Sequence, residues 1–316
     1  MRIPEELSRS IEALVEGIPL SELSRSSKEL SGAYRGVKGA SGIAMLASER
    51  QRLAYLYTRL PATYAVIHKV LSEISGLQIE SMADVGAGPG TGMWAAADVF
   101  PSLKEVVLYE RDPHFIELGK KLSIPLKSFK KTWVQADLEK IEAIAPQDLI
   151  LASYFLGEIP NTRRENIFLK LWAATQKVLV IIEPGTPKGF EDILRSREFF
   201  IEQGAHLIAP CPHARKCPIV KPDWCHFYAR VERSSFHRQI KGGTLNFEDE
   251  KFSYLILGKE RGPEIQGRIV RRPQKNTGFV KLTICSKEGI EQKTITKKTK
   301  AEYKAARKAD WGDVFN

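Results

Sequence analysis

Three glycines alternate with other residues after an acidic residue in the segment Asp84-Val-Gly-Ala-Gly-Pro-Gly90. The segment follows an apolar run that we expect to be a strand, and glycine lets a backbone turn sharply and approach a ligand closely. A dinucleotide-binding loop needs a glycine three residues after Gly88, where this chain has Thr91, so the nicotinamide template does not fit. The acid two residues before the first glycine suits a cationic sulfonium cofactor with a free amino group, S-adenosylmethionine. A glycine-rich turn that binds no ligand is the alternative.

Two further acids occupy the positions where later strands are expected to end. Glu110 follows the apolar run 106–109, and a carboxylate there can accept both ribose hydroxyls of a nucleoside. Asp137 follows the third expected strand, where it can meet the adenine amino group, although an acid at a strand end is common by itself. We therefore predict one set of cofactor-binding residues: Asp84, Gly86, Gly88, Gly90, Glu110 and Asp137.

The segment Ser153–Glu158 follows the fourth expected strand, where enzymes that methylate exocyclic amines usually carry an Asn/Asp-Pro-Pro-aromatic element. This chain lacks that element. Tyr154 and Phe155 could stack on a base or be buried in the core, and Glu158 could act as a general base or cap a helix. Methylation at the five position of a pyrimidine needs a cysteine nucleophile, and each cysteine has a better assignment. The catalytic residue is unknown from the sequence.

The chain contains four cysteines, namely Cys211, Cys217, Cys225 and Cys285. A reducing compartment argues against disulfides, and four thiolates suit either zinc or an iron–sulfur cluster. The gaps between the first three are wider than those of short zinc knuckles. His213 and His226 lie close by and could replace a cysteine as ligands. Four buried thiols without a metal are the remaining alternative.

Strands and helices that alternate from residue 81 onward must position these residues. We expect strands at 82–85, 105–109, 133–136, 149–153 and 177–182, with helices at 93–99, 113–122, 163–175 and 190–203. Such alternation predicts a doubly wound, largely parallel α/β sheet. Strands at 205–208 and 252–257 should complete it.

Four regions follow from this pattern. We predict an N-terminal helical region at 1–80, interrupted by a glycine-rich loop that includes Gly32 and Gly36, and an α/β domain at 81–209 and 252–259. A metal-binding or cluster-binding insertion covers 210–251. A basic C-terminal segment at 260–316 should hold strands at 279–285 and 292–297 and a helix at 300–309.

The positive charge of the chain is unevenly distributed. The net charge is +10, and residues 260–316 contain 14 Lys/Arg against 7 Asp/Glu. This excess indicates a polyanionic partner, with nucleic acid the first candidate, or else a merely soluble basic surface. In the insertion, Phe227, Tyr228 and Phe236 interleave with the residues that we predict to contact RNA: Arg230, Arg233, His237, Arg238 and Lys241. A solvated helix with a buried aromatic face is the alternative there.

No apolar run approaches the ~18 residues of a membrane-spanning helix, so no membrane partner is expected. The first thirty residues include Glu5, Glu6, Glu12 and Glu16 and lack the apolar region of a signal peptide. A transit peptide would also avoid acids. We expect a monomer in the bacterial cytoplasm.

Several short motifs occur in the order found in one known family. They are Arg59–Tyr64, the glycine loop, Cys211-Pro212-His213, Trp224–Phe227, Arg233–His237 and Lys241–Thr244. Over about residues 30–290 the sequence resembles the mitochondrial-type small-ribosomal-subunit methyltransferase-like family, whose bacterial relatives are called ribosomal RNA methylases. The resemblance implies a class I methyltransferase-like fold with an S-adenosylmethionine pocket, and a small-subunit rRNA partner.

The resemblance also implies a [4Fe–4S] cluster, with Cys211, Cys217, Cys225 and Cys285 as its ligands. The expected function is that of a methyltransferase-like RNA-binding protein in assembly of the small ribosomal subunit. An active rRNA methyltransferase and a non-enzymatic, zinc-binding assembly factor are the two alternatives. Whether the protein is an enzyme stays open, because the catalytic element after the fourth strand is missing.

Overall fold

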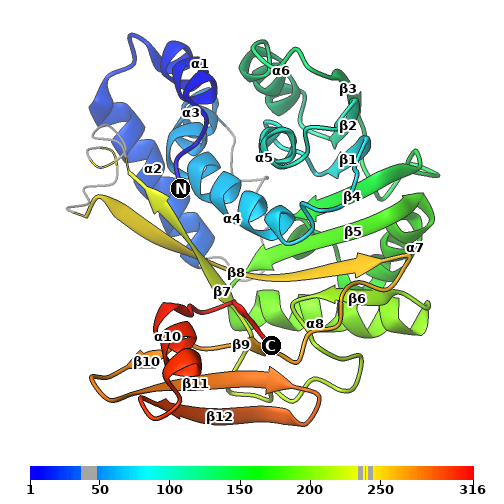
Figure 1. Cartoon of the computed structure of the whole chain (residues 1–316). Coiled ribbons are helices and arrows are strands. Elements are labelled where there is room, and N and C mark those ends of the chain that lie inside the picture. Colours follow the sequence, from blue (N-terminus) through cyan, green and yellow to red (C-terminus); the bar gives the residue numbers. More distant parts are fainter. Residues whose placement is uncertain (37–47, 234–237, 239, 241–244) are drawn as a thin grey trace. The chain divides into compact units, whose positions relative to one another are not determined.

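The computed structural model describes residues 1–36, 48–233, 238, 240 and 245–316 (Figure 1). The chain divides into two compact units. The first comprises Met1–Gln176 with Ala229–Glu250, and the second comprises Lys177–Tyr228 with Lys251–Asn316. The predicted insertion at 210–251 is therefore shared, because its cysteine-bearing part lies in the second unit and its arginine-rich part in the first.

Four helices open the first unit: α1 (Glu5–Val15), α2 (Leu20–Gly36), α3 (Glu49–Thr58) and α4 (Leu60–Ser72). α1 buries Leu7, Ile11 and Val15, which recur every fourth residue on one face. Our prediction of a loop at Gly32 and Gly36 is wrong, since both lie within α2. Glycine costs a helix only about 1 kcal/mol per residue, and α2 packs against α3. Residues 37–47, the rest of the glycine-rich segment, lie outside the described residues.

A parallel sheet forms the centre of the first unit. Its strands are β1 (Ser81–Val85), β2 (Glu105–Glu110), β3 (Lys130–Gln135) and β4 (Gln147–Ser153), in the order β3-β2-β1-β4. The helices that alternate with them are α5 (Thr91–Val99), α6 (Pro113–Leu122) and α7 (Arg164–Ala174), with short 3₁₀ turns η2 (Leu156–Glu158) and η3 (Asn161–Arg163). β4 is buried almost throughout, as a strand covered on both faces must be. This topology confirms the predicted methyltransferase-like α/β fold.

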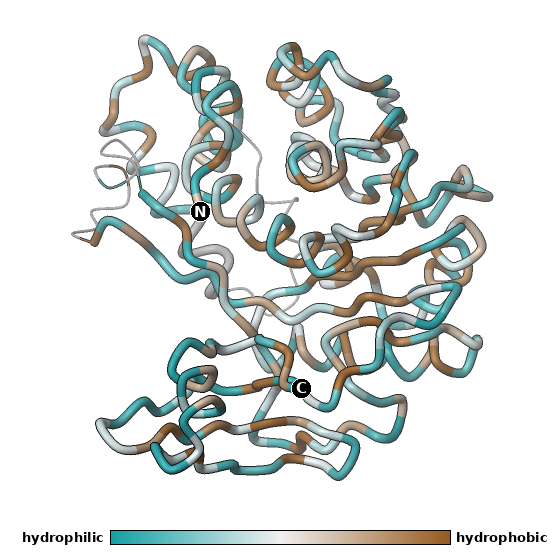
Figure 2. The backbone as a smooth tube through the Cα atoms, viewed as in Figure 1, coloured by the Kyte–Doolittle hydropathy of each residue, from teal (hydrophilic) through white to brown (hydrophobic). Residues whose placement is uncertain are grey.

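The second unit begins with β5 (Thr175–Pro184), α8 (Pro187–Glu202) and β6 (His206–Ala209). β8 (Phe247–Gly258) runs antiparallel to both β5 and β6 through its second half, and β7 (Phe227–Glu232) pairs with β8. The expected closing strand 252–257 is the buried half of β8. Figure 2 shows long hydrophobic stretches along β4 and β5.

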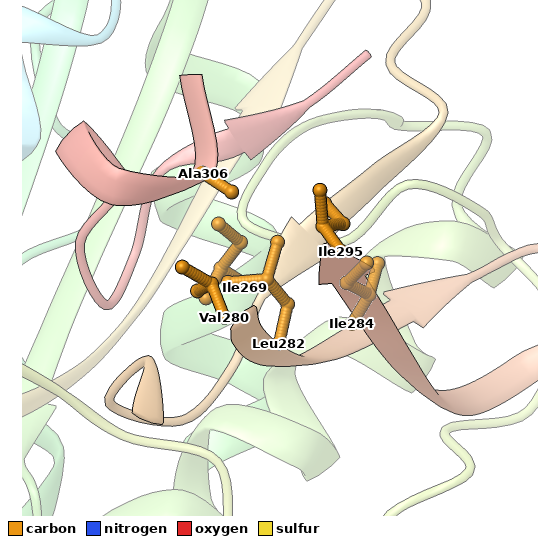
Figure 3. Close-up of a cluster of buried hydrophobic side chains, with 6 residues drawn as sticks. All are labelled: Ile269, Val280, Leu282, Ile284, Ile295 and Ala306. Carbon is orange, nitrogen blue, oxygen red and sulfur yellow. The ribbon is translucent and has the colours of Figure 1, made fainter. Parts of the chain in front are cut away.

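A second sheet follows in the C-terminal segment of the same unit. It contains β9 (Gly267–Ile269), β10 (Gln274–Lys275), β11 (Phe279–Ser286), β12 (Gly289–Thr296) and β13 (Val314–Phe315), and α10 (Lys300–Lys308) packs on it. The buried side chains between helix and sheet are Ile269, Val280, Leu282, Ile284, Ile295 and Ala306 (Figure 3). Successive strand residues face opposite sides, so Cys285 lies on the face of β11 that is turned away from this core.

Candidate functional sites

The glycine loop lies where the sequence predicts, between β1 and α5. Gly86, Gly88 and Gly90 have φ values of 71°, 53° and 80°, a left-handed region that side-chain-bearing residues rarely adopt. The backbone N–H groups of Gly86 and Ala87 donate to the Tyr109 carbonyl oxygen at 2.9 and 3.0 Å. The loop is thereby fixed to the carboxyl end of β2, at the sheet edge where open α/β folds bind ligands.

Glu110 fastens the same loop through its side chain. Its Oε2 accepts a hydrogen bond from the Gly88 backbone N–H at 2.7 Å, and its Oε1 accepts from the backbone N–H groups of Arg111 and Asp112 at 2.8 Å each. The carboxyl group is 2% exposed, and this burial raises its pKa above the ordinary value. Each carboxylate oxygen has two lone pairs, so acceptor capacity remains for a ligand hydroxyl.

Asp84 is a buried acid with unused acceptors. Its side chain is 1% exposed, and among the described residues no donor meets either oxygen at full hydrogen-bonding geometry. The backbone N–H groups of Gly92 and Met93 lie close and favour the charged form, but burial and the nearby Glu110 charge raise the pKa to about 7. A Cβ on Gly92 would stand 2.4 Å from Asp84 Oδ2, so α5 starts directly against this carboxyl group. A cationic ligand would complete such a site.

One cavity brings together three of the six predicted cofactor residues, Gly86, Glu110 and Asp137, with the segment after β4. Asp84, Gly88 and Gly90 do not line it. Phe155 lies against Gly86, since its Cδ2 is 3.0 Å from the place where a Cβ on Gly86 would be. The sequence left open whether Phe155 stacks on a base or is buried, and it is 8% exposed and packed on the glycine loop.

Two features of the cavity wall could not be seen in the sequence. Tyr154 has a φ of 56°, which strains a residue with a side chain. Arg111 Nη2 pairs with Glu158 Oε2 at 3.3 Å, and both residues line the cavity. Glu158, a candidate general base, therefore already holds an ion-pair partner.

All four cysteines line a single cavity in the second unit. Cys211 follows β6, Cys217 and Cys225 belong to the segment before β7, and Cys285 lies on β11. None forms a disulfide. Burial raises the pKa of Cys285 to about 12 and that of Cys225 well above its usual value, and the neighbouring thiols raise both further. The thiols of Cys225 and Cys285 are thus neutral at pH 7 unless a metal displaces their protons.

The two histidines near the cysteines differ in placement. His213 lines the cysteine cavity, whereas His226 stacks on Trp224 at 5.1 Å and meets Trp311 edge-on at 4.8 Å between ring centroids. His226 is therefore part of an aromatic packing cluster. Within the described ranges, no three His, Cys, Asp or Glu side chains are close enough together to share one metal ion.

Two buried arginines also line the cysteine cavity, and the sequence reasoning missed both. Arg197 on α8 and Arg268 on β9 are each 3% exposed. Arg268 Nε donates to the Pro210 carbonyl oxygen at 3.1 Å, and in the β9–β11 ladder Arg268 lies directly opposite Cys285. The one available signal was the spacing of Arg197 from Ile193 and Phe200, which places it on the apolar face of α8.

The predicted RNA-binding arginines are engaged within the protein. Arg230 donates from Nε and Nη2 to Asp249 at 2.7 and 2.9 Å, and Arg233 Nη2 donates to Glu248 at 2.5 Å. Arg238 donates to the side-chain oxygen of Asn246. The other two predicted residues, His237 and Lys241, lie outside the described residues. The carboxylates compensate much of the positive charge at Arg230 and Arg233.

One group of exposed cations lies on and just before α10. Lys300, Lys304 and Arg307 recur at intervals of four and three residues, which places them on one side of the helix; we call these three residues the α10 cation row. Lys297 and Lys298 precede the helix and are exposed as well. Tyr303 donates from its hydroxyl to the Thr277 carbonyl oxygen at 3.2 Å, which holds the helix to the β10–β11 turn. In the part of the chain that the structure describes, no helix is long and apolar enough to cross a membrane.

Comparison with known proteins gives relatives from fungi and human. The chain is 26% identical to a mitochondrial Rsm22-cox11 tandem protein of Schizosaccharomyces pombe, over 85% of this chain and 43% of that protein. It is 24% identical to the human mitochondrial ribosome assembly protein METTL17, over 85% of this chain and 63% of that protein. The chain thus spans about half the length of these relatives.

Among solved structures, magnesium protoporphyrin IX methyltransferase from Synechocystis with bound SAH matches with a TM-score of 0.42 and 8% identity, over 79% of this chain and all of that one. A match at this level supports no inference about activity.

These relatives correct one expectation. We predicted a protein of the bacterial cytoplasm, and this is wrong, because the S. pombe, human and Saccharomyces cerevisiae relatives are all mitochondrial proteins. That prediction rested on the acidic residues among the first thirty residues. The family model described as "Mitochondrial small ribosomal subunit Rsm22" matches residues 49–316, and the chain therefore belongs to the Rsm22 family.

Proposed function

We propose that this protein is an RNA-binding factor in assembly of the small ribosomal subunit, and that a thiolate-held [4Fe–4S] cluster fixes its cationic C-terminal segment. The observation that carries the proposal is the convergence of four cysteines on one cavity, with Cys285 contributed by the C-terminal sheet. A group bound by all four would join the 210–228 segment to β11. The role is structural and requires no electron transfer.

The donor set of this cavity fits a [4Fe–4S] cluster. Four thiolates with no carboxylate are the usual ligands of [4Fe–4S] clusters, although they also bind zinc. A cluster is wider than one ion, so its ligands need not converge as closely as those of zinc. A zinc-binding assembly factor remains the alternative.

We also propose that the glycine loop binds S-adenosylmethionine. The left-handed glycines, the buried Glu110 and the unsatisfied Asp84 carboxyl group support it. Asp84, Gly88 and Gly90 would support the methionyl part, and Gly86, Glu110 and Asp137 the nucleoside. Phe155 lies against Gly86 and Glu158 is paired with Arg111, so each would have to leave that contact to stack on a base or to act as a general base. We therefore favour cofactor binding without methyl transfer. The strained backbone of Tyr154 is the observation that supports the alternative, an active rRNA methyltransferase.

RNA binding is supported by the α10 cation row and the neighbouring Lys297 and Lys298. Lysine and arginine side chains neutralise phosphates and release counterions, which gives affinity that falls with salt. Arg230 and Arg233 stay predicted contacts, but an RNA phosphate would have to compete there with Asp249 and Glu248.

The experiment is to map ultraviolet crosslinks between the full-length protein and rRNA in cells, and to score rRNA methylation in wild-type and deletion strains. Crosslinks confined to small-subunit rRNA, with an unchanged methylation pattern in the deletion strain, are expected. A nucleotide that loses its methyl group on deletion and regains it with the wild-type gene would establish the enzyme instead. Absence of small-subunit crosslinks would refute the proposed function.

A further inference from the structure

Arg197 is held in an unusual place for a cation. It lies on the buried face of α8, one turn after Ile193 and one before Phe200, and its side chain is 3% exposed. Its Nη2 donates to the carbonyl oxygens of His213 and Arg215, at 2.7 Å each. The guanidinium group therefore holds the loop between Cys211 and Cys217 through two hydrogen bonds to its backbone.

No carboxylate lines the cavity beside Arg197, although the exposed Glu198 lies near enough to act on Cys217. The residues that line its cavity include four cysteines but neither Asp nor Glu, and within the described ranges Arg197 forms no ion pair. Its Nε is buried and has no hydrogen-bond acceptor there. Buried Arg164 offers a contrast, since its Nε and Nη2 both donate to carbonyl oxygens, those of Ile159 and Leu156. Arginine is rarely buried without a partner, because losing water from a charge is costly unless another charge replaces it.

Four deprotonated thiols would supply the missing counter-charge. Four thiolates carry a charge of −4, and either a divalent cluster core or Zn²⁺ leaves the group at −2. A negative group in this cavity would therefore face the guanidinium across a medium of low dielectric, where the attraction is strong.

We propose that Arg197 is the counter-ion and positioning residue of the four-cysteine site: it holds the Cys211–Cys217 loop and donates its Nε–H to a sulfur atom of the bound group. This inference rests on the proposed cluster and adds a role that the cysteines alone do not give. A positive charge and an N–H donor near the sulfurs stabilise the more negative, reduced state of a cluster. Arg197 should consequently raise the reduction potential and slow loss of the metal.

Two substitutions separate the effect of the positive charge of Arg197 from that of its hydrogen bonds to the loop. Arg197→Gln removes the charge but keeps an amide that can donate to one carbonyl group, and Arg197→Lys keeps the charge but loses the planar fork. Arg195→Gln is the matched control, because Arg195 lies on the exposed side of the same helix and pairs with Glu191. The reduction potential of the anaerobically isolated full chain is measured by a titration followed with electron paramagnetic resonance. The loss of metal to a chelator is measured alongside it.

We expect Arg197→Gln to shift the potential to more negative values and to lose metal several-fold faster. Arg197→Lys should keep most of the potential but still lose metal faster, and Arg195→Gln should match the wild type in both. An unchanged potential in a fully loaded Arg197→Gln protein would overturn the proposal. If Arg197→Gln does not fold, Arg197→Lys decides the proposal. It must lose metal faster than Arg195→Gln, and an equal rate would overturn the proposal.

The metal content of the wild type separates this inference from the proposed function. Wild type that holds zinc would refute the cluster, and the chelator measurement alone would then decide on Arg197. Wild type that binds neither iron nor zinc would overturn both.

Discussion

Replacing Asp84 by asparagine should stabilise the fold at high pH while abolishing cofactor binding. The Asp84 carboxyl group is 1% exposed and has a pKa of about 7, against 3.8 in its ordinary state. Because the folded-state pKa is the higher one, the folded protein binds more protons than the unfolded chain between about pH 4 and pH 7. The contribution of Asp84 to stability therefore falls as pH rises through this window.

The magnitude follows from the size of the shift. About three pKa units correspond to a cost of about 4 kcal/mol once the carboxyl group is ionised above pH 7. Asparagine cannot ionise, so it avoids this cost, but its buried amide N–H₂ group loses water without a clear acceptor, at about 1–3 kcal/mol. The variant should be more stable than wild type by about 1–3 kcal/mol at pH 8. It should be no more stable than wild type near pH 5, where Asp84 is protonated.

The assay is urea unfolding of both proteins at pH 5, 6, 7 and 8. We expect the difference in unfolding free energy to grow in favour of the variant by about 2.5 kcal/mol from pH 5 to pH 8. Glu117→Gln on the exposed face of α6 controls for the loss of one negative charge and should show no such trend. Calorimetry should show that Asp84→Asn no longer binds S-adenosylmethionine. Parallel pH profiles for Asp84→Asn and wild type would refute the reasoning.

Two further changes test the loop and the RNA surface. Gly92→Ala should destabilise the protein by about 1–3 kcal/mol in chemical unfolding, because its Cβ would clash with Asp84 and Leu151. Gly76→Ala has open space around its Cβ and should be nearly neutral; equal effects of the two changes would contradict the close packing. Binding to single-stranded rRNA should weaken with rising salt. Alanine at all three positions of the α10 cation row should make the slope of log affinity against log salt shallower by about 2. Alanine at the exposed residues Lys120 and Lys121 should leave it unchanged, and an unaffected slope in the α10 variant would place the RNA surface elsewhere.

Much of the α/β unit could be predicted because its elements are locally encoded. Central strands of a parallel sheet are continuous apolar runs, so β1 and β4 are visible in the sequence, and an acid or a glycine directly after such a run must lie at the carboxyl edge. Glu110 lies there, and its Oε2 accepts a hydrogen bond from the Gly88 backbone N–H. Helix ends were less predictable. α2 continues through Gly32 to Gly36, because tertiary packing outweighs the weak preference of glycine for loops.

The contacts that distinguish the sites could not be predicted, since they join segments far apart in sequence. Arg230 looks like an RNA ligand until β7 pairs with β8 and brings Asp249 beside it. Arg197 looks like one more charged helix residue, and only the fold places it beside Cys285, on a strand 88 residues later. Charge counts along a chain do not show which charges are compensated.

Iron and acid-labile sulfide content tests the central claim most directly. The measurement compares anaerobically isolated wild type with Cys285→Ser, because Cys285 is the ligand that ties the C-terminal sheet to the 210–228 segment. The wild type should contain about four iron and four sulfide per chain. Cys285→Ser should lose most of its iron and sulfide and be cleaved faster by proteases within residues 260–316. The first unit, which contains the glycine loop, should stay resistant to proteolysis. A colourless wild type with about one zinc per chain, or a Cys285→Ser protein with full iron and sulfide, would contradict the account.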